Sequence, residues 1–163
     1  MRILALVFFY IIWYNNENGK WGFSVIFFDF EVNALPQLPL PPDEAKQINP
    51  VTRAFVGDAV YTLLVRTRLV LSSGYKTGEL NRLASSVVSA HGQSGTLETV
   101  LPKFTPEEEE IYKRGRNAKK PTKSKNATVG EYVRSTGLEA VVGYLYLTGR
   151  KERIEELFFG ENA

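Results

Sequence analysis

The sequence of 163 residues is long enough for one compact domain with an apolar core of its own. It contains no cysteine, which excludes disulfides, thiolate zinc sites and thiol nucleophiles and agrees with a reducing, cytoplasmic location. The formal charge is only +2, so any nucleic-acid binding must come from a local cluster of basic residues. The single histidine, His91, leaves little material for Ser-His or Cys-His catalysis, and we expect it to be an ordinary surface or capping residue.

The first fourteen residues are strongly apolar. A membrane-spanning helix needs about 20 apolar residues, and this run is too short, so we expect no stable membrane association. Two other readings are a signal peptide, although no A-x-A-like cleavage motif follows, and an overlong gene model in which residues 1–35 are not part of the natural protein. Residues 23–28 form a second apolar patch that is either a strand or irregular.

Residues 35–42 hold four of the eight prolines in the chain. Successive prolines remove N–H donors and block helix formation, which is typical of an extended linker. We therefore expect a domain boundary here. An apolar extension with its linker would occupy residues 1–42, poorly structured or loosely attached, and a helical domain would occupy residues 43–163.

The remainder of the chain predicts an all-α domain. Helices are expected over about residues 50–71, 77–90, 93–101, 106–117, 129–147 and 151–158. Asn49 and Thr105 are N-cap residues, each followed by proline at the first helical position. Glu108 completes a capping box with Thr105, and Gly149 is expected to end the long apolar helix.

Two acidic residues, Asp58 and Glu139, interrupt helix-length stretches that are otherwise almost wholly apolar. Carboxylates are rarely buried unless they are paired or bound to a cation. Gly57 and Gly143 lie close to them in mid-helix, where glycine costs about 1 kcal/mol relative to alanine unless another backbone or a ligand must come close. Two carboxylates from two packed helices suit Mg²⁺, which in turn suits hydrolysis of a phosphodiester.

Buried ion pairs are the alternative explanation of the two acids. In that arrangement Asp58 would pair with Arg53 or Arg66, and Glu139 would pair with Arg134.

A basic segment, residues 113–125, covers the end of the fourth predicted helix and the residues after it, with seven cations in thirteen residues and no acid among them. We expect it to bind RNA through Lys113, Arg114, Arg116, Asn117, Lys119, Lys120, Lys123 and Lys125. The absence of aromatic residues from this run favours contacts with the phosphates of a duplex over stacking on single-stranded bases. The alternative is a solvated loop whose charge balances the acidic residues 107–110.

Four blocks of the sequence resemble the ribonuclease III family. Residues 55–61, Phe-Val-Gly-Asp-Ala-Val-Tyr, resemble the signature helix of its catalytic domain, and residues 135–147 resemble its second acidic helix. Residues 85–90 and 113–119 resemble the small branch called Mini-ribonuclease III, which lacks the domain that binds double-stranded RNA. The resemblance covers about residues 43–159, with the blocks in the order and spacing of the family.

This resemblance implies the fold of the ribonuclease III endonuclease domain, a helical bundle. It also implies an endoribonuclease that cleaves double-stranded RNA with Mg²⁺, for which Mn²⁺ can substitute. Asp58 and Glu139 would be its catalytic and metal-binding residues. Larger relatives carry two further acids, at the positions of Val51 and Thr136, so the number of ions and of protein ligands stays open. The family further implies a homodimer, a cytoplasmic location and maturation of the 5′ and 3′ ends of the 23S ribosomal RNA precursor.

Two other functions compete with this one. The missing acids at Val51 and Thr136 would suit a non-catalytic RNA-binding factor in ribosome assembly on the same scaffold. A plain helical interaction module would require ion-paired acids and a basic segment that binds nothing.

Overall fold

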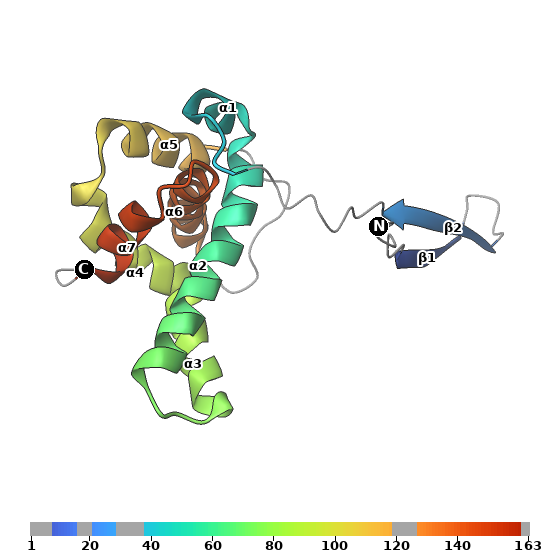
Figure 1. Cartoon of the computed structure of the whole chain (residues 1–163), viewed down its shortest axis with the longest axis horizontal. Coiled ribbons are helices and arrows are strands. Elements are labelled where there is room, and N and C mark those ends of the chain that lie inside the picture. Colours follow the sequence, from blue (N-terminus) through green and yellow to red (C-terminus); the bar gives the residue numbers. More distant parts are fainter. Residues whose placement is uncertain (1–7, 16–20, 29–37, 119–126, 161–163) are drawn as a thin grey trace, which may run out of the picture. The chain divides into compact units, whose positions relative to one another are not determined.

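The structure is a computed structural model that describes residues 8–15, 21–28, 38–118 and 127–160. The chain divides into two units, Met1–Gln37 and Leu38–Ala163, and each is described by itself. In the first unit, strands β1 (Phe8–Asn15) and β2 (Trp21–Phe28) form an antiparallel pair, with Phe8 opposite Phe28 (Figure 1). Of the two readings of residues 23–28, the structure therefore shows the strand.

The second unit is helical, which confirms the predicted all-α domain. It contains α1 (Pro42–Gln47), α2 (Pro50–Ser72), α3 (Thr77–Val88), α4 (Ala90–Val100), the 3-10 turn η1 (Leu101–Lys103), α5 (Pro106–Arg116), α6 (Val129–Leu147) and α7 (Lys151–Phe159). The observed bounds lie within a few residues of the predicted ones. The exception is α1, which falls partly in the expected linker and was not predicted.

Local signals in the sequence account for several helix ends. The Asn49 side chain accepts a hydrogen bond from the Val51 amide, and Thr105 and Glu108 form the predicted capping box. Gly149 has φ +74°, the left-handed conformation that favours glycine. There the Arg150 amide donates to the Leu145 carbonyl, which is the bond that closes a Schellman motif and ends α6.

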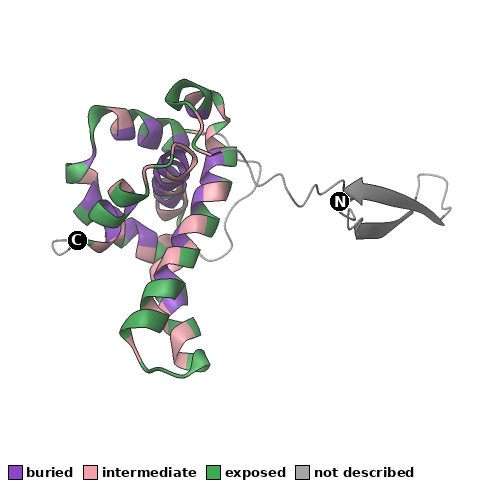
Figure 2. Cartoon of the chain, viewed as in Figure 1, coloured by how far each residue is buried: buried purple, intermediate pink, exposed green. Residues whose placement is uncertain are grey.

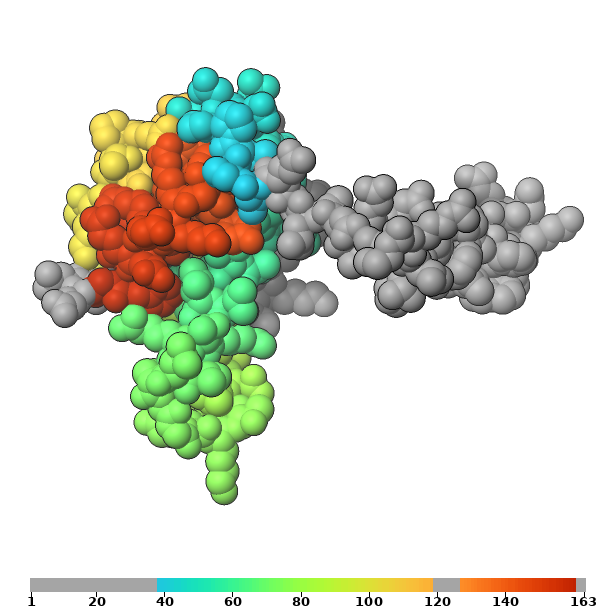
Figure 3. Space-filling model, viewed as in Figure 1, coloured from blue at the N-terminus to red at the C-terminus, as the bar shows by residue number. Residues whose placement is uncertain are grey.

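Helix α6 lies at the centre of the helical unit and packs most extensively against α2, then against α5 and α4 (Figures 1 and 2). Its buried residues run from Ser135 to Leu145, interrupted by the half-buried Glu139. An apolar helix enclosed on most sides is the expected core of a helical bundle. By contrast, α3 and the end of α2 extend away from this core in the space-filling view (Figure 3).

The short helix α1 is held by the buried side chain of Arg53, which is on α2. The Arg53 guanidinium donates from Nη1 to the carbonyls of Ala45 and Lys46, at 3.0 and 3.2 Å. These carbonyls belong to the last turn of α1, where no later amide of the helix is available to bond them. A six-residue helix is too short to be stable alone, so this contact explains why the segment is helical despite its prolines.

Among the described residues, no helix combines the length and the apolar character required to cross a membrane.

Candidate functional site

Helices α2 and α6 approach each other closely at two glycines. A Cβ placed on Gly57 would lie 1.8 Å from the Glu139 carbonyl oxygen, and one placed on Gly143 would lie 2.1 Å from the Arg53 carbonyl oxygen. Only glycine allows the two backbones to come this close. The expectation that these glycines admit another backbone is thus met, and the residue next to Asp58 touches the backbone of Glu139.

Asp58 is exposed, which corrects the expectation that it lies in an apolar core. The surface of α2 around it is not covered within this chain: Ala59 is exposed, and Phe55 is 79% exposed. Among the described residues Asp58 forms no salt bridge. The alternative pairing with Arg53 is not found, because that guanidinium bonds the end of α1 instead.

Glu139 is half-buried, and its carboxylate accepts a hydrogen bond from the side chain of Gln93 on α4. The distance from Gln93 Nε2 to Glu139 Oε1 is 3.1 Å. Arg134, the alternative partner of Glu139, donates to the Ser94 carbonyl and lies 3.4 Å from the Glu98 carboxylate.

The sequence alone did not single out Gln93. A signal was present, because Gln93 shares one helix face with Leu97 and Val100, at spacings of four and seven residues. All three side chains are buried, and Gln93 is only 1% exposed. A buried amide on an apolar face indicates a specific polar partner.

The two positions at which larger relatives carry acids add no carboxylate here. Thr136 is buried, and its hydroxyl donates to the Tyr132 carbonyl at 2.8 Å. Val51 is half-buried in the first turn of α2. No group of three or more acidic or histidine side chains suited to a metal ion occurs in the described parts of the chain. Two carboxylates, one of them exposed, still fit Mg²⁺, which keeps several waters and takes one or two carboxylates from a protein.

The first part of the predicted RNA-binding segment forms the end of α5. Lys113 pairs with Glu109 at 2.6 Å, as its four-residue spacing predicts, and Arg114 lies 3.9 Å from the Glu110 carboxylate. The Arg116 guanidinium lies 5.7 Å from the centre of the Tyr112 ring. All three cations are exposed, as is the C-cap residue Asn117. Lys119, Lys120, Lys123 and Lys125 lie outside the described residues.

His91 is an exposed residue near the start of α4, as expected. Its Nδ1 lies 2.7 Å from Oε1 of Glu131, the residue that forms a capping box with Thr128 at the start of α6. Hydrogen bonds from His91 and Thr128 lower the pKa of Glu131 to about 2. His91 therefore contributes to the start of a helix rather than to the pair of acids.

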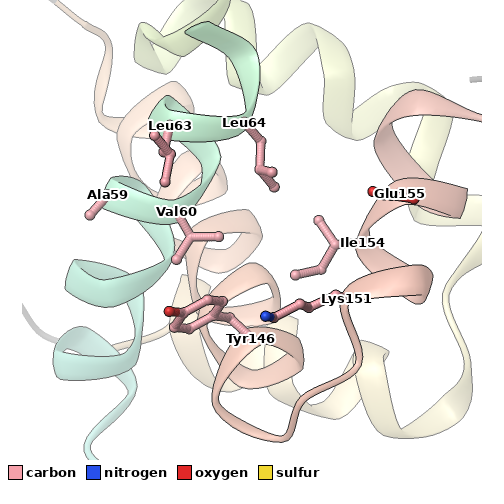
Figure 4. Close-up of a pocket in the computed structure, with 8 residues that line it drawn as sticks. All are labelled: Ala59, Val60, Leu63, Leu64, Tyr146, Lys151, Ile154 and Glu155. Carbon is pink, nitrogen blue, oxygen red and sulfur yellow. The ribbon is translucent and has the colours of Figure 1, made fainter. Parts of the chain in front are cut away.

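A pocket of about 430 Å³ lies between α2, the end of α6 and α7 (Figure 4). Its wall is largely apolar: Val60 and Leu64 on α2 lie on one side, and Ile154 on α7 lies on the other. Lys151 and Glu155 are the charged residues of the wall. Neither Asp58 nor Glu139 lines it. This pocket is therefore separate from the candidate metal site.

Comparison with known proteins gives consistent matches for the helical unit. The model of the Ribonuclease III domain family matches residues 52–150. The chain is 47% identical to the Mini-ribonuclease 3 of Staphylococcus aureus over 114 residues, covering 69% of this chain and 85% of that protein. It is 46% identical to the Mini-ribonuclease 3 of Streptococcus pneumoniae, covering 68% of this chain and 88% of that protein. A crystal structure of a Fusobacterium nucleatum protein superposes with a TM-score of 0.64 at 31% identity, covering 71% of this chain and 92% of that one.

Proposed function

We propose that this chain, which belongs to the ribonuclease III family and to its Mini-ribonuclease 3 branch, holds a Mg²⁺ ion for RNA cleavage through Asp58 and Glu139 together. Membership of that family makes the protein an endoribonuclease that acts on double-stranded RNA. The close approach of α2 and α6 at Gly57 is the observation that carries the proposal, because it brings the two acid-bearing positions together.

The two acids contribute differently. Asp58 is exposed, so its carboxylate is accessible to both a hydrated cation and a phosphate group. Glu139 is half-buried and hydrogen-bonded by Gln93, which favours a fixed orientation of its carboxylate. A bound Mg²⁺ supplies Lewis-acid chemistry, reducing the charge on the scissile phosphate and activating a water. Mn²⁺ offers the same oxygen coordination and is proposed to substitute.

The basic segment at the end of α5 is proposed to bind the phosphate backbone of the duplex. Arg114, Arg116 and Asn117 are exposed and supply N–H donors, and the proposed contacts continue through Lys119 and Lys120. Phosphate contacts carry no sequence information, so this surface would position a duplex rather than select its sequence.

The exposed face of α2 supports a homodimer. Phe55 is 79% exposed and Leu63 is 63% exposed, with the exposed Ala59 midway between them at a four-residue spacing. Large apolar side chains aligned on one helix face are costly to leave in water and are typical of an interface. A second copy of the chain is the proposed partner on this face.

We further propose that the substrate is the precursor of 23S ribosomal RNA, cut near both its 5′ and 3′ ends, in the cytoplasm. This substrate rests on membership of the Mini-ribonuclease 3 branch. Mapping both ends of purified precursor RNA after incubation with the protein would test it, and uncut ends would refute it.

The central experiment is cleavage of a duplex RNA, with Mg²⁺ and with a chelator, by the wild type and by Asp58→Asn. We expect the variant to bind the duplex but to lose cleavage, whereas the control Asp43→Asn, an exposed acid on α1, should cut like the wild type. Equal cutting by wild type and Asp58→Asn would remove Asp58 from the mechanism. A wild type that binds duplex RNA but never cuts it would instead favour a non-catalytic binding factor.

A further inference from the structure

The side chain of Gln93 joins two elements through its amide nitrogen. Nε2 donates to the Val88 carbonyl at the end of α3 and to the Glu139 carboxylate on α6, each at 3.1 Å. Both acceptors lack a hydrogen to donate in return, so only the NH₂ end of the amide can face them. Chemistry therefore determines which way this amide points.

That orientation leaves the oxygen of the amide without a hydrogen-bond donor in the described part of the chain. Gln93 Oε1 is buried and has no hydrogen-bond partner among the described residues. Buried polar atoms are normally hydrogen-bonded, so an unpaired one indicates a constraint on its side chain that needs an explanation. Here the constraint is the pair of donated bonds, one of which ends on a carboxylate assigned to the metal site.

The backbone around Gln93 is tightly held. A Cβ on the preceding residue, Gly92, would lie 2.1 Å from the Ser86 carbonyl oxygen, so the start of α4 packs directly against the end of α3. The Gly92 amide also donates to the side chain of Ser89, which caps α4. The Gln93 amide therefore extends from a rigid point towards Glu139.

We propose that Gln93 is a positioning residue for the metal site, which orients the Glu139 carboxylate for a divalent cation and does not itself contact the ion. This inference rests on the proposed function, in that Glu139 must be a ligand. A partner that orients a ligand typically contributes 10–100-fold to metal affinity. Replacing the amide by a side chain of similar length without donors should remove that contribution.

The test is direct binding of Mn²⁺, followed by electron paramagnetic resonance, to full-length protein without RNA. Gln93→Met keeps the length of the side chain and removes both donors, and we expect it to bind Mn²⁺ about 10–100-fold more weakly. Thr99→Val is the matched control, because it removes a side-chain hydrogen bond from the same helix, 2.8 Å to the Thr96 carbonyl, without touching Glu139. Its Mn²⁺ affinity should stay within about twofold of the wild type.

A double-mutant cycle separates positioning from a general loss of structure. If Gln93 acts through Glu139, Gln93→Met should weaken Mn²⁺ binding in the wild type and add nothing in a Glu139→Gln background. Gln93→Asn is a second variant if Gln93→Met unfolds, since its amide is one methylene too short to bridge Val88 and Glu139. Wild-type Mn²⁺ affinity in both Gln93 variants, or full additivity in the cycle, would overturn this inference alone. Wild-type affinity in Glu139→Gln itself would overturn the proposed metal site as well.

Discussion

Gly57 on α2 and Gly143 on α6 meet backbone to backbone. A Cβ on Gly57 would lie 2.7 Å from the Gly143 nitrogen, and a Cβ on Gly143 would lie 3.1 Å from the Gly57 nitrogen. The two helices with the acidic residues are therefore in contact at the point where neither has a side chain. Any side chain introduced there would push the helices, and with them Asp58 and Glu139, apart.

We expect Gly57→Ala to destabilise the protein by about 3 kcal/mol, the upper end of typical overpacking costs, because its Cβ would meet backbone that cannot rotate away. Gly95→Ala, in mid-helix on α4 with nothing within 4 Å of an added Cβ, should instead be stabilising by about 0.5–1 kcal/mol. Urea unfolding of both variants measures the difference. A Gly57→Ala protein as stable as the wild type would show that α2 and α6 are not in backbone contact.

Salt dependence tests the basic segment. Replacing Arg114, Arg116, Lys119 and Lys120 with glutamine should weaken duplex binding and flatten the slope of log K against log salt, by roughly 0.9 for each phosphate that the variant no longer neutralises. Arg116→Gln alone should lower the slope by the amount expected for one phosphate, whereas Lys151→Gln, an exposed cation on α7, should leave it unchanged. Duplex-binding titrations at several salt concentrations, with the metal chelated, provide the slopes. The same slope in the quadruple variant and the wild type would mean that the segment is only solvated.

The carboxylate of Glu107 predicts a pH dependence of stability. It lies 2.8 Å from Lys46 Nζ and accepts hydrogen bonds from Tyr144 and Arg150, at 2.8 and 2.6 Å. Burial disfavours its charged form, but these bonds outweigh burial and lower the pKa of Glu107 to about 2. Because the folded pKa lies below the unfolded value of 4.5, the stabilisation is complete above about pH 4.5 and is lost as the pH falls towards 2.

We therefore expect Glu107→Gln to lose about 1–2 kcal/mol of unfolding free energy at pH 7, a figure reduced by partial exposure of the carboxylate. The difference from the wild type should shrink between pH 4.5 and 2, as the native carboxylate becomes protonated. Thermal unfolding of both proteins across this range measures it. A difference independent of pH would show that packing, and not charge, accounts for the loss.

The proposed dimer makes a separate prediction about α2. Phe55→Gln with Leu63→Gln should raise the dimer dissociation constant about 10⁴-fold, because the dimer contains two copies of each side chain and each of the four loses about 1.4 kcal/mol of apolar burial. Monomer stability should change little, because both side chains are largely exposed within one chain. Val129→Gln, 68% exposed at the start of α6, is the control. Sedimentation velocity gives the populations, and a wild type that is monomeric at all concentrations would refute the interface.

The sequence predicted most of the helices because their ends are encoded locally. Asn49-Pro50 and the Thr105–Glu108 capping box start helices whatever lies around them, and Gly149 ends one. Helix α1 was missed because it is short and begins in the proline-rich segment, and because its last carbonyls are satisfied by Arg53 from the next helix. That contact exists only in the folded chain.

The candidate site was predicted only in part. The glycines near the acids correctly indicated a close backbone approach. Glycine in mid-helix is unfavourable, and this signal can be read from the sequence of each helix without knowing its partner. The exposure of Asp58 was not foreseen, because an apolar stretch is equally compatible with a core and with a face left for a partner. Gln93 was overlooked because its bond to Glu139 depends on how α4 packs against α6.

The contact between Arg53 and α1 limits how far the chain can be shortened from its beginning. A version starting beyond Lys46 would leave the buried guanidinium without either of its acceptors, and Glu107 without one of its cations. It would also lack the Leu40 amide, which donates to the Leu147 carbonyl at 2.8 Å. Crystallisation trials with a minimal nuclease should therefore retain every residue from Leu38 onward, prolines included.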